Sequence, residues 1–298
     1  MWLFLAFGSA LFAGITAILA KCGIKNVDSN LATAIRTIVV LFFAWMMYFI
    51  TLSTSSVDDT TIRHIQEIPV HSLTFLILSG LTTGASWLCY FKALQIGDIN
   101  KVTPIDKFSS VLTILLALIF LREEINVAKM IGIIGIGIGT YLMIEKKEMK
   151  GPSNHKSSWL IYAIFSAVFA SLTSILAKVG FQNVDSNLGT AVRTCVVLIM
   201  AWLIVFLQKK TGDIKHIPAK SWLFIILSGF STGASWLCYY SALKDGPASI
   251  VNPVDKLSIV VSVTFSYFVF REKLNRKSLM GLILIIIGTF FMIAPFSR

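Results

Sequence analysis

Apolar residues dominate ten stretches of this 298-residue chain, and polar residues gather in the short intervals between them. The stretches lie near residues 2–20, 31–51, 72–92, 100–121 and 127–144, and then near 159–177, 188–207, 222–241, 249–270 and 277–295. A helix needs roughly 20 residues to cross a hydrocarbon core about 30 Å thick. Backbone amides in lipid must be satisfied within the segment, which favours helices over open strands. The pattern therefore predicts an all-α polytopic membrane protein with ten transmembrane helices.

Composition supports a membrane protein and changes the interpretation of the net charge. Hydrophobic residues make up 56% of the chain and charged residues only 14%. The formal charge of +11 is compatible with a nucleic-acid partner, but the basic residues lie in short loops, where membrane topology accounts for them. We therefore expect the lipid bilayer as surroundings and no nucleic-acid partner. The cysteines and histidines show no ligand spacing, so we expect no metal site and no cofactor.

The chain is duplicated. Residues 3–37 match residues 160–194 at 22 of 35 positions, and "GLTTGASWLCYFKAL" (80–94) aligns with "GFSTGASWLCYYSAL" (229–243). Because its counterpart is internal, the first apolar segment is expected to be a retained helix rather than a cleaved signal peptide. The duplication predicts a first five-helix repeat over 1–144, a charged linker loop over 145–158 and a second five-helix repeat over 159–298. We call these repeats the first and the second copy.

Five crossings per copy place the second copy upside down relative to the first, which predicts inverted repeats and an internal pseudo-dimer within one chain. A homodimer is a second arrangement compatible with the sequence. Basic residues in the loops after the fifth, seventh and ninth helices predict that those loops are cytoplasmic and that both termini lie outside an inner (plasma) membrane. These residues are Lys146, Lys147, Lys150, Lys156, Lys209, Lys210, Lys215, Lys220, Arg271, Lys273, Arg276 and Lys277.

Each fourth helix carries an Asp–Lys pair after a proline. "KVTPIDKFSS" (101–110) contains Asp106 and Lys107, and "IVNPVDKLSI" (250–259) contains Asp255 and Lys256. A charge about six residues inside a membrane helix is costly unless it is paired or hydrated, so such residues indicate a functional cavity. The prolines, Pro104 and Pro253, predict kinks of the kind that line transport sites.

Two arginines are candidate partners for these carboxylates. Arg36 and Arg193 lie about six residues inside the second and seventh helices. We hypothesise that Asp106 pairs with Arg36 and Asp255 with Arg193, which leaves Lys107 and Lys256 for the cavity. The alternative is an ion network that only fixes helix packing. Asp106 and Asp255 are also the candidates for carrying a coupled proton.

The third helix of each copy has a polar face. Trp87 and Tyr90 repeat as Trp236 and Tyr239, and either line a substrate cavity or anchor the helices at the membrane interface. Glycines spaced four apart (80 and 84, 229 and 233) predict close helix packing. "NVDSNL" at 26–31 and 183–188 predicts helix N-caps. Lys178, which ends the sixth helix, is expected to extend to the membrane interface.

Acidic loops follow the fourth helices, which contain Pro104 and Pro253. These loops are Arg122-Glu123-Glu124 in the first copy and Arg271-Glu272 in the second. In the loops, the prolines and the two five-helix repeats, the chain resembles the EamA-type branch of the drug/metabolite transporter superfamily. The resemblance covers nearly the whole chain and implies transport of a small molecule. It also implies cytoplasmic termini, which disagrees with the loop charges.

The charges inside the helices favour an anionic substrate. Arg36, Arg193, Lys107 and Lys256 outnumber Asp106 and Asp255, and arginine suits carboxylate or phosphate. No phosphate-binding motif G-x-x-x-x-G-K-[ST] is present, so we expect a secondary transporter that works by alternating access. The alternatives are a flippase for a phosphate-linked lipid and a structural or sensor protein. An enzyme is disfavoured because the one Asp-Asp pair, Asp58-Asp59, has no second acidic cluster.

Overall fold

The computed structural model describes residues 1–23, 27–54, 68–96, 108–124, 126–143, 158–265, 267 and 275–293, and every regular element in these ranges is helical. Eight spans are long and apolar enough to cross a membrane, with α11 and α12 together forming one of them, and α6 and α7 are shorter apolar helices. The elements are α1 (Trp2–Gly23), α2 (Ser29–Thr54), α4 (Val70–Ile96), α6 (Ser109–Phe120), α7 (Val127–Met143), α8 (Ser158–Gly180), α9 (Ser186–Leu207), the 3₁₀ helix η2 (Thr211–His216), α10 (Ala219–Asp245), α11 (Ala248–Lys256), α12 (Ser258–Phe265) and α13 (Arg276–Ile293).

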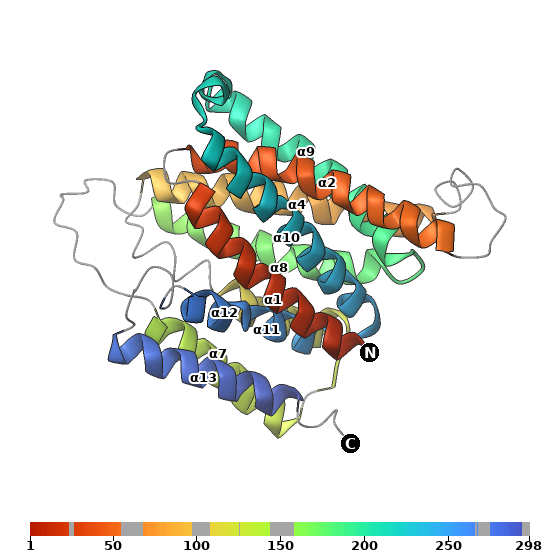
Figure 1. The fold of residues 1–298 in the computed structure, drawn as a ribbon. Helices are drawn as coiled ribbons and strands as arrows, with labels where there is room; N and C mark the ends of the chain where they lie inside the picture. The colour runs from red at the N-terminus through yellow and green to blue at the C-terminus, as the bar shows by residue number, and fades with distance from the viewer. Residues whose placement is uncertain are drawn as a thin grey trace.

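The two copies interlock instead of forming separate bundles. Helix α1 of the first copy packs on α10 of the second, and α4 of the first copy packs on α8 of the second. Helices α2 and α9 pair in the upper layer of Figure 1, and α7 and α13 pair in the lower layer. Each of these four contacts joins one copy to the other, so the interior of the molecule is largely an interface between copies.

Equivalent helices run antiparallel where they meet. Asn30, at the start of α2, donates to Oε1 of Gln208, just past the end of α9, at 2.6 Å. Conversely, Asn187 at the start of α9 donates to Oγ1 of Thr51 near the end of α2, at 2.9 Å. This start-to-end pairing, made twice, is the contact pattern that an inverted second copy requires.

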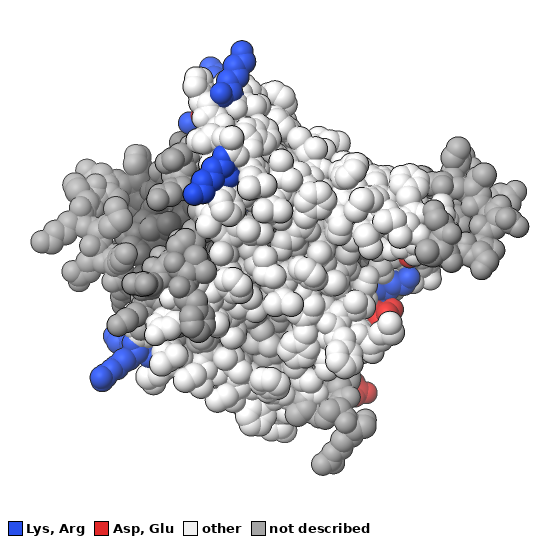
Figure 2. All heavy atoms as spheres, in the orientation of Figure 1, with Lys and Arg blue, Asp and Glu red and all other residues white. Residues whose placement is uncertain are grey.

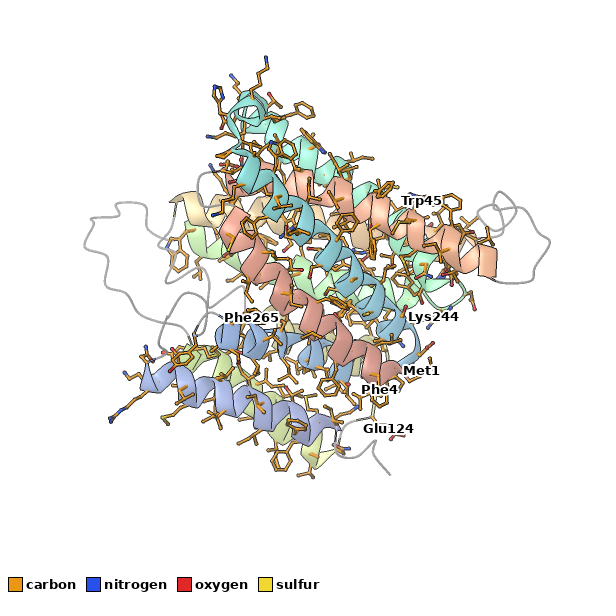
Figure 3. The ribbon with its side chains drawn as sticks, viewed as in Figure 1. Met1, Phe4, Trp45, Glu124, Lys244 and Phe265 are labelled. Atoms are coloured by element: carbon orange, nitrogen blue, oxygen red, sulfur yellow. The ribbon has the colours of Figure 1, made fainter. Side chains whose placement is uncertain are left out.

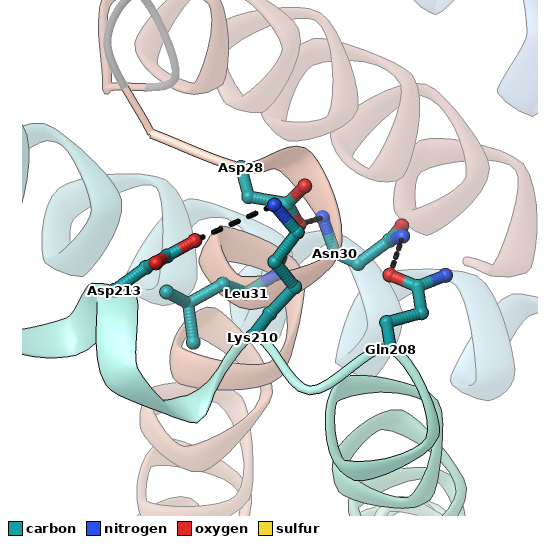
Figure 4. Close-up of polar contacts among 6 residues, drawn as sticks. All are labelled: Asp28, Asn30, Leu31, Gln208, Lys210 and Asp213. Atoms are coloured by element: carbon teal, nitrogen blue, oxygen red, sulfur yellow. Dashed lines mark hydrogen bonds and ion pairs between the residues drawn. The ribbon is translucent and has the colours of Figure 1, made fainter.

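The N-cap prediction for "NVDSNL" is confirmed in both copies. The Asp28 carboxylate accepts from the backbone N–H groups of Asn30 and Leu31 at 2.9 and 3.1 Å (Figure 4). Asp185 caps α9 in the same way, through Asn187 and Leu188. Each aspartate therefore satisfies two of the amides that the first helical turn leaves unpaired.

The glycines spaced four apart on the third helices do pack closely. A Cβ at Gly80 would lie 2.7 Å from the Cβ of Val196, and a Cβ at Gly229 would lie 2.6 Å from the Cβ of Val39. The missing side chains let α4 approach α9 and let α10 approach α2 to backbone distance.

The helix predicted over 249–270 is one span that is interrupted at Leu257, four residues after the proline for which a kink is predicted. Helix α11 ends at Lys256, α12 begins at Ser258, and the N–H of Leu257 bonds to Val254 O at 3.0 Å in a tighter, 3₁₀-like turn. Pro253 inside α11 supplies no amide hydrogen and loosens this segment. In the first copy α6 begins at Ser109, the counterpart of Ser258, whereas Pro104, Asp106 and Lys107 lie outside the described residues.

We expect Gly139→Ala to weaken the α7–α13 pair. A Cβ at Gly139 would lie 2.6 Å from the backbone oxygen of Gly281, so one helix must move. Strain of this kind costs about 1–3 kcal/mol in the free energy of unfolding. Thermal unfolding of the purified protein should show a lower midpoint. Gly137→Ala is the matched control, since the nearest atom to its Cβ would be Cγ2 of Val111 at 3.8 Å. Equal midpoints for the two variants would contradict the packing assignment.

Candidate functional site

Arg193 is enclosed by helices of both copies. It lies on α9, only 1% of its surface is exposed, and its guanidinium bonds to two hydroxyls of α4. Nε donates to Ser79 Oγ at 2.9 Å, and Nη2 donates to Thr83 Oγ1 at 2.6 Å. These bonds are possible because Gly80 brings the two backbones together at this level.

Aromatic rings and one unsatisfied nitrogen complete the surroundings of Arg193. Its Cζ lies 4.6 Å from the ring centroid of Tyr240 and 5.3 Å from that of Trp236, within range of a cation–π attraction. Nη1 is buried and has no hydrogen-bond partner among the described residues. The positive charge is thus stabilised by dipoles and π-faces, and no carboxylate of the described residues contacts it.

The predicted ion pair between Asp255 and Arg193 is absent from the described part of the chain. Asp255 lies one residue before the last of α11, and its carboxylate accepts from Ser9 Oγ on α1 at 2.5 Å. Ser9 also lies 3.3 Å from Ser235 Oγ on α10. The two charges therefore face different neighbours: Asp255 is turned to α1 and Arg193 to α4. Lys256, next to Asp255, is half-buried.

Arg36, the counterpart of Arg193, has different contacts. It lies on α2 and is half-buried. Its guanidinium makes no hydrogen bond or ion pair with any residue that the structure describes. Its predicted partner, Asp106, and the neighbouring Lys107 and Pro104 lie outside that part of the chain.

The aromatic residues of the third helices fall into two groups. Tyr239 has an internal role, because its hydroxyl donates to Ser174 Oγ at 3.1 Å and Asn252 Nδ2 lies 3.3 Å from it. Trp236 lies against Arg193. In the first copy, Trp87 packs on the cluster around Leu31 and Ile35, and Tyr90 packs on Ala93 and Ala163.

Two polar residues of this region escaped the sequence reasoning. Asn252 precedes Pro253 on α11, and its Oδ1 is buried without a hydrogen-bond partner in the described residues. Ser174 on α8 accepts from both Tyr239 and Asn252. Neither residue is repeated in the other copy, where Thr103 and Ala17 stand in their places, so a search for repeated polar residues passes over both.

Glu123 was also missed, although its loop was noted. Its carboxylate accepts from the backbone N–H groups of Ala248 and Ser249, at 2.6 and 3.1 Å, and from the Ser249 hydroxyl. A first-copy residue therefore caps the N-terminus of the broken helix in the second copy, where negative charge is favoured.

Lysines reinforce the same end of the bundle, where Figure 3 labels Met1, Glu124 and Lys244. Lys178 donates to the carbonyls of Lys244 and Gly246, both at 2.8 Å, and Lys244 donates to Val184 O at 2.7 Å. The Lys178 ammonium thus caps the carboxyl end of α10, and its extension to the membrane interface stays a prediction.

Comparison with known proteins gives a family match, curated relatives and a matching structure. The model of the EamA-like transporter family matches residues 1–145 and 157–294. An uncharacterized transporter in the cobO 3' region of Sinorhizobium sp. is 44% identical over 131 residues, covering 44% of this chain and 93% of that protein. An S-adenosylmethionine uptake transporter of Rickettsia bellii is 25% identical over 236 residues, covering 73% and 71%. One crystal structure covers 100% of this chain and 98% of its own at 17% identity, with a TM-score of 0.76, which shows that the fold is shared.

We expect Glu123→Ala to destabilise the start of α11. The substitution removes three hydrogen bonds to a charged acceptor and leaves two amides without their partner. The cost should be about 2–3 kcal/mol in the free energy of unfolding. Thermal unfolding and backbone hydrogen exchange at residues 248–251 measure it. Glu124→Ala makes the same change in net charge at an exposed neighbour and is the control. If both variants unfold alike, Glu123 does not act as the cap.

Proposed function

Since the chain belongs to the EamA-like transporter family, within the drug/metabolite transporter superfamily, we propose that it is a secondary transporter of a small anionic organic metabolite. The anionic character of the proposed substrate rests on the contacts of the two arginines. Neither Arg36 nor Arg193 contacts a carboxylate among the described residues, although both lie inside membrane-spanning helices. A fixed positive charge in such surroundings favours a negatively charged visitor.

A carboxylate or a phosphate suits these arginines best, because a guanidinium donates to either group in a bidentate manner. The relative named for S-adenosylmethionine uptake does not itself support an anionic cargo, because that molecule carries a sulfonium and an ammonium beside its carboxylate and is a net cation. The aromatic rings of Trp236 and Tyr240 beside Arg193 would exclude water from the bound group.

Transport would proceed by alternating access between two inverted repeats. In this proposal ten helices cross the membrane, five in residues 1–144 and five in residues 159–298, with 145–158 as the linking loop. The start-to-end pairing of α2 with α9 supports the inversion. One chain would then be a complete internal pseudo-dimer, whose halves rock against each other around the arginines.

A gradient would supply the energy. Asp255 lies beside the break between α11 and α12 and is held by the Ser9 hydroxyl instead of by a cation, which leaves it able to gain and lose a proton. Asp106 is its sequence counterpart and the second proposed carrier. Lys107 and Lys256 would add positive charge near the bound substrate, while Trp87, Tyr90 and Tyr239 would shape the path.

The orientation follows from the distribution of basic residues. Figure 2 shows Lys and Arg side chains at two corners of one end of the bundle, over the α9–α10 connection and at the start of α13. At the opposite end, beside the N-terminus, acidic and basic side chains are mixed. We place the basic end in the cytoplasm and both termini outside a plasma membrane.

Arg36→Gln should reduce transport of the anionic substrate at least about tenfold, since it removes a charged donor worth about 1.5–3 kcal/mol. Uptake into proteoliposomes, with a panel of labelled carboxylates and phosphate esters, measures the loss. Lys209→Gln removes the same charge at an exposed position and should retain transport. Undiminished uptake in both Arg36→Gln and Arg193→Gln would rule out an anion site at these arginines.

The orientation has its own test. In a variant without native cysteines, Lys150→Cys should react with an impermeant maleimide only after the membrane is permeabilised, because residue 150 lies in the basic linker. A cysteine inserted directly after Met1 should react in intact cells. Reaction of the first variant in intact cells would reverse the assignment.

A further inference from the structure

Arg36 and Arg193 lie at equivalent positions of the two copies, and their backbones are packed in the same way. The backbone oxygen of Arg193 lies 3.2 Å from where a Cβ of Gly80 would be, and that of Arg36 lies 3.1 Å from the same point at Gly229. Val196 and Val39 occupy equivalent positions in these contacts, at 2.7 and 2.6 Å. The backbones of α9 on α4 and of α2 on α10 are therefore packed alike.

The side chains nevertheless differ. Arg193 bonds to Ser79 and Thr83, whereas Arg36 bonds to neither Ser228 nor Thr232, the counterparts of those residues. Ser228 Oγ donates to Ile225 O and Thr232 Oγ1 donates to Ser228 O, both at 2.7 Å. Ser79 and Thr83 likewise donate to backbone carbonyls, both at 2.9 Å, and still accept from Arg193, so these bonds do not prevent a contact with Arg36. Arg193 is hydrogen-bonded to its hydroxyl pair. Arg36 is not hydrogen-bonded to the equivalent pair, although the backbones are packed alike.

Exposure differs in the same sense. Arg193 is 1% exposed, while Arg36 is half-buried and makes no polar contact within the described residues. Desolvating a guanidinium is costly, so the surroundings of Arg36 favour a negatively charged group. The hydroxyls of Ser228 and Thr232 lie one turn apart on α10 and already donate to backbone carbonyls, so toward Arg36 they are acceptors.

Both bonds of Arg193 cross from one copy to the other, because α9 belongs to the second copy and α4 to the first. They therefore depend on how the two copies lie against each other. In an inverted repeat, the opposite arrangement of the copies exchanges the two environments.

We propose that, in the state seen here, the Arg36 guanidinium binds an oxyanion of the carboxylate or phosphate class, and that Ser79 and Thr83 hold Arg193 closed. When the copies rock, Ser228 and Thr232 accept from Arg36 as Arg193 is released, so the two arginines offer the site in turn. This inference rests on the anionic cargo proposed above. Each hydroxyl pair then competes with the substrate for its guanidinium.

The two states are not equivalent in energy. Tyr240, which lies against Arg193, has Phe91 as its sequence counterpart, and the ring of a tyrosine and that of a phenylalanine attract a cation to different extents. The two states of the exchange therefore differ in free energy, and the state described is the one in which Arg193 is closed.

Phenylglyoxal, which modifies accessible guanidinium groups, tests the exchange without a transport assay. In the full-length purified protein we expect Arg36 to react at least about tenfold faster than Arg193, as two charge-assisted hydrogen bonds protect the latter. Peptide mass spectrometry measures each rate. The double variant Ser79→Ala/Thr83→Val should raise the Arg193 rate at least about tenfold, whereas Thr83→Ser, which keeps the hydroxyl, should not. Size-exclusion profiles and melting midpoints verify that each variant is folded.

Inorganic phosphate and succinate serve as anion probes. Either should slow modification of Arg36, and the matched variant Ser228→Ala/Thr232→Val, which removes the pair that closes on Arg36 in the other state, should leave that protection in place. The exchange would be overturned by equal modification rates for the two arginines, or by an Arg193 rate that does not change in the Ser79→Ala/Thr83→Val variant. This holds even if anions protect both sites. Unequal rates that depend on Ser79 and Thr83 but respond to neither probe would overturn the anionic cargo and leave the exchange standing.

Discussion

The contact between the Arg193 guanidinium and the hydroxyls of Ser79 and Thr83 is the interaction on which the functional architecture depends. A charge in an apolar interior must be compensated, and a carboxylate would do so at the cost of fixing the pair permanently. Hydroxyls compensate only part of the charge. They leave Nη1 unpaired and allow the aromatic rings of Trp236 and Tyr240 to share the stabilisation. An arginine held in this way can be exchanged, whereas an arginine in a buried ion pair would remain locked.

Much of the fold could be predicted because its signals are local. The N-caps at Asp28 and Asp185 depend on residues two and three positions away, and the close approach at Gly80 and Gly229 depends on a spacing of four. Duplication supplied a further constraint, since it predicts opposed copies, and the start-to-end pairing of α2 with α9 agrees with that prediction. The family follows from the same features.

The site was predicted less well, because it depends on which way each side chain points around its helix. Asp255 and Arg193 lie at suitable depths for an ion pair, but depth does not say which neighbour a residue faces, and α11 turns Asp255 to Ser9. The break at Leu257 was missed because a proline indicates a kink without locating it. Glu123 escaped because its partners, Ala248 and Ser249, are backbone amides and a serine that carry no repeated charge. Equivalent residues of the two copies make different contacts, as the two arginines do. A search for repeated residues does not detect such a difference.

The glycine contacts of α7 and α13 have a consequence for how the chain can evolve. Gly139 meets the backbone of Gly281, and Gly281 meets the backbone of Gly139, each at less than the distance a Cβ would tolerate. The two positions descend from different residues of the ancestral half, yet each is now the steric limit of the other. The two halves are therefore sterically coupled at this contact. A methyl group added to either glycine must be accommodated by the backbone of the other half, and separating the halves would expose both glycine faces.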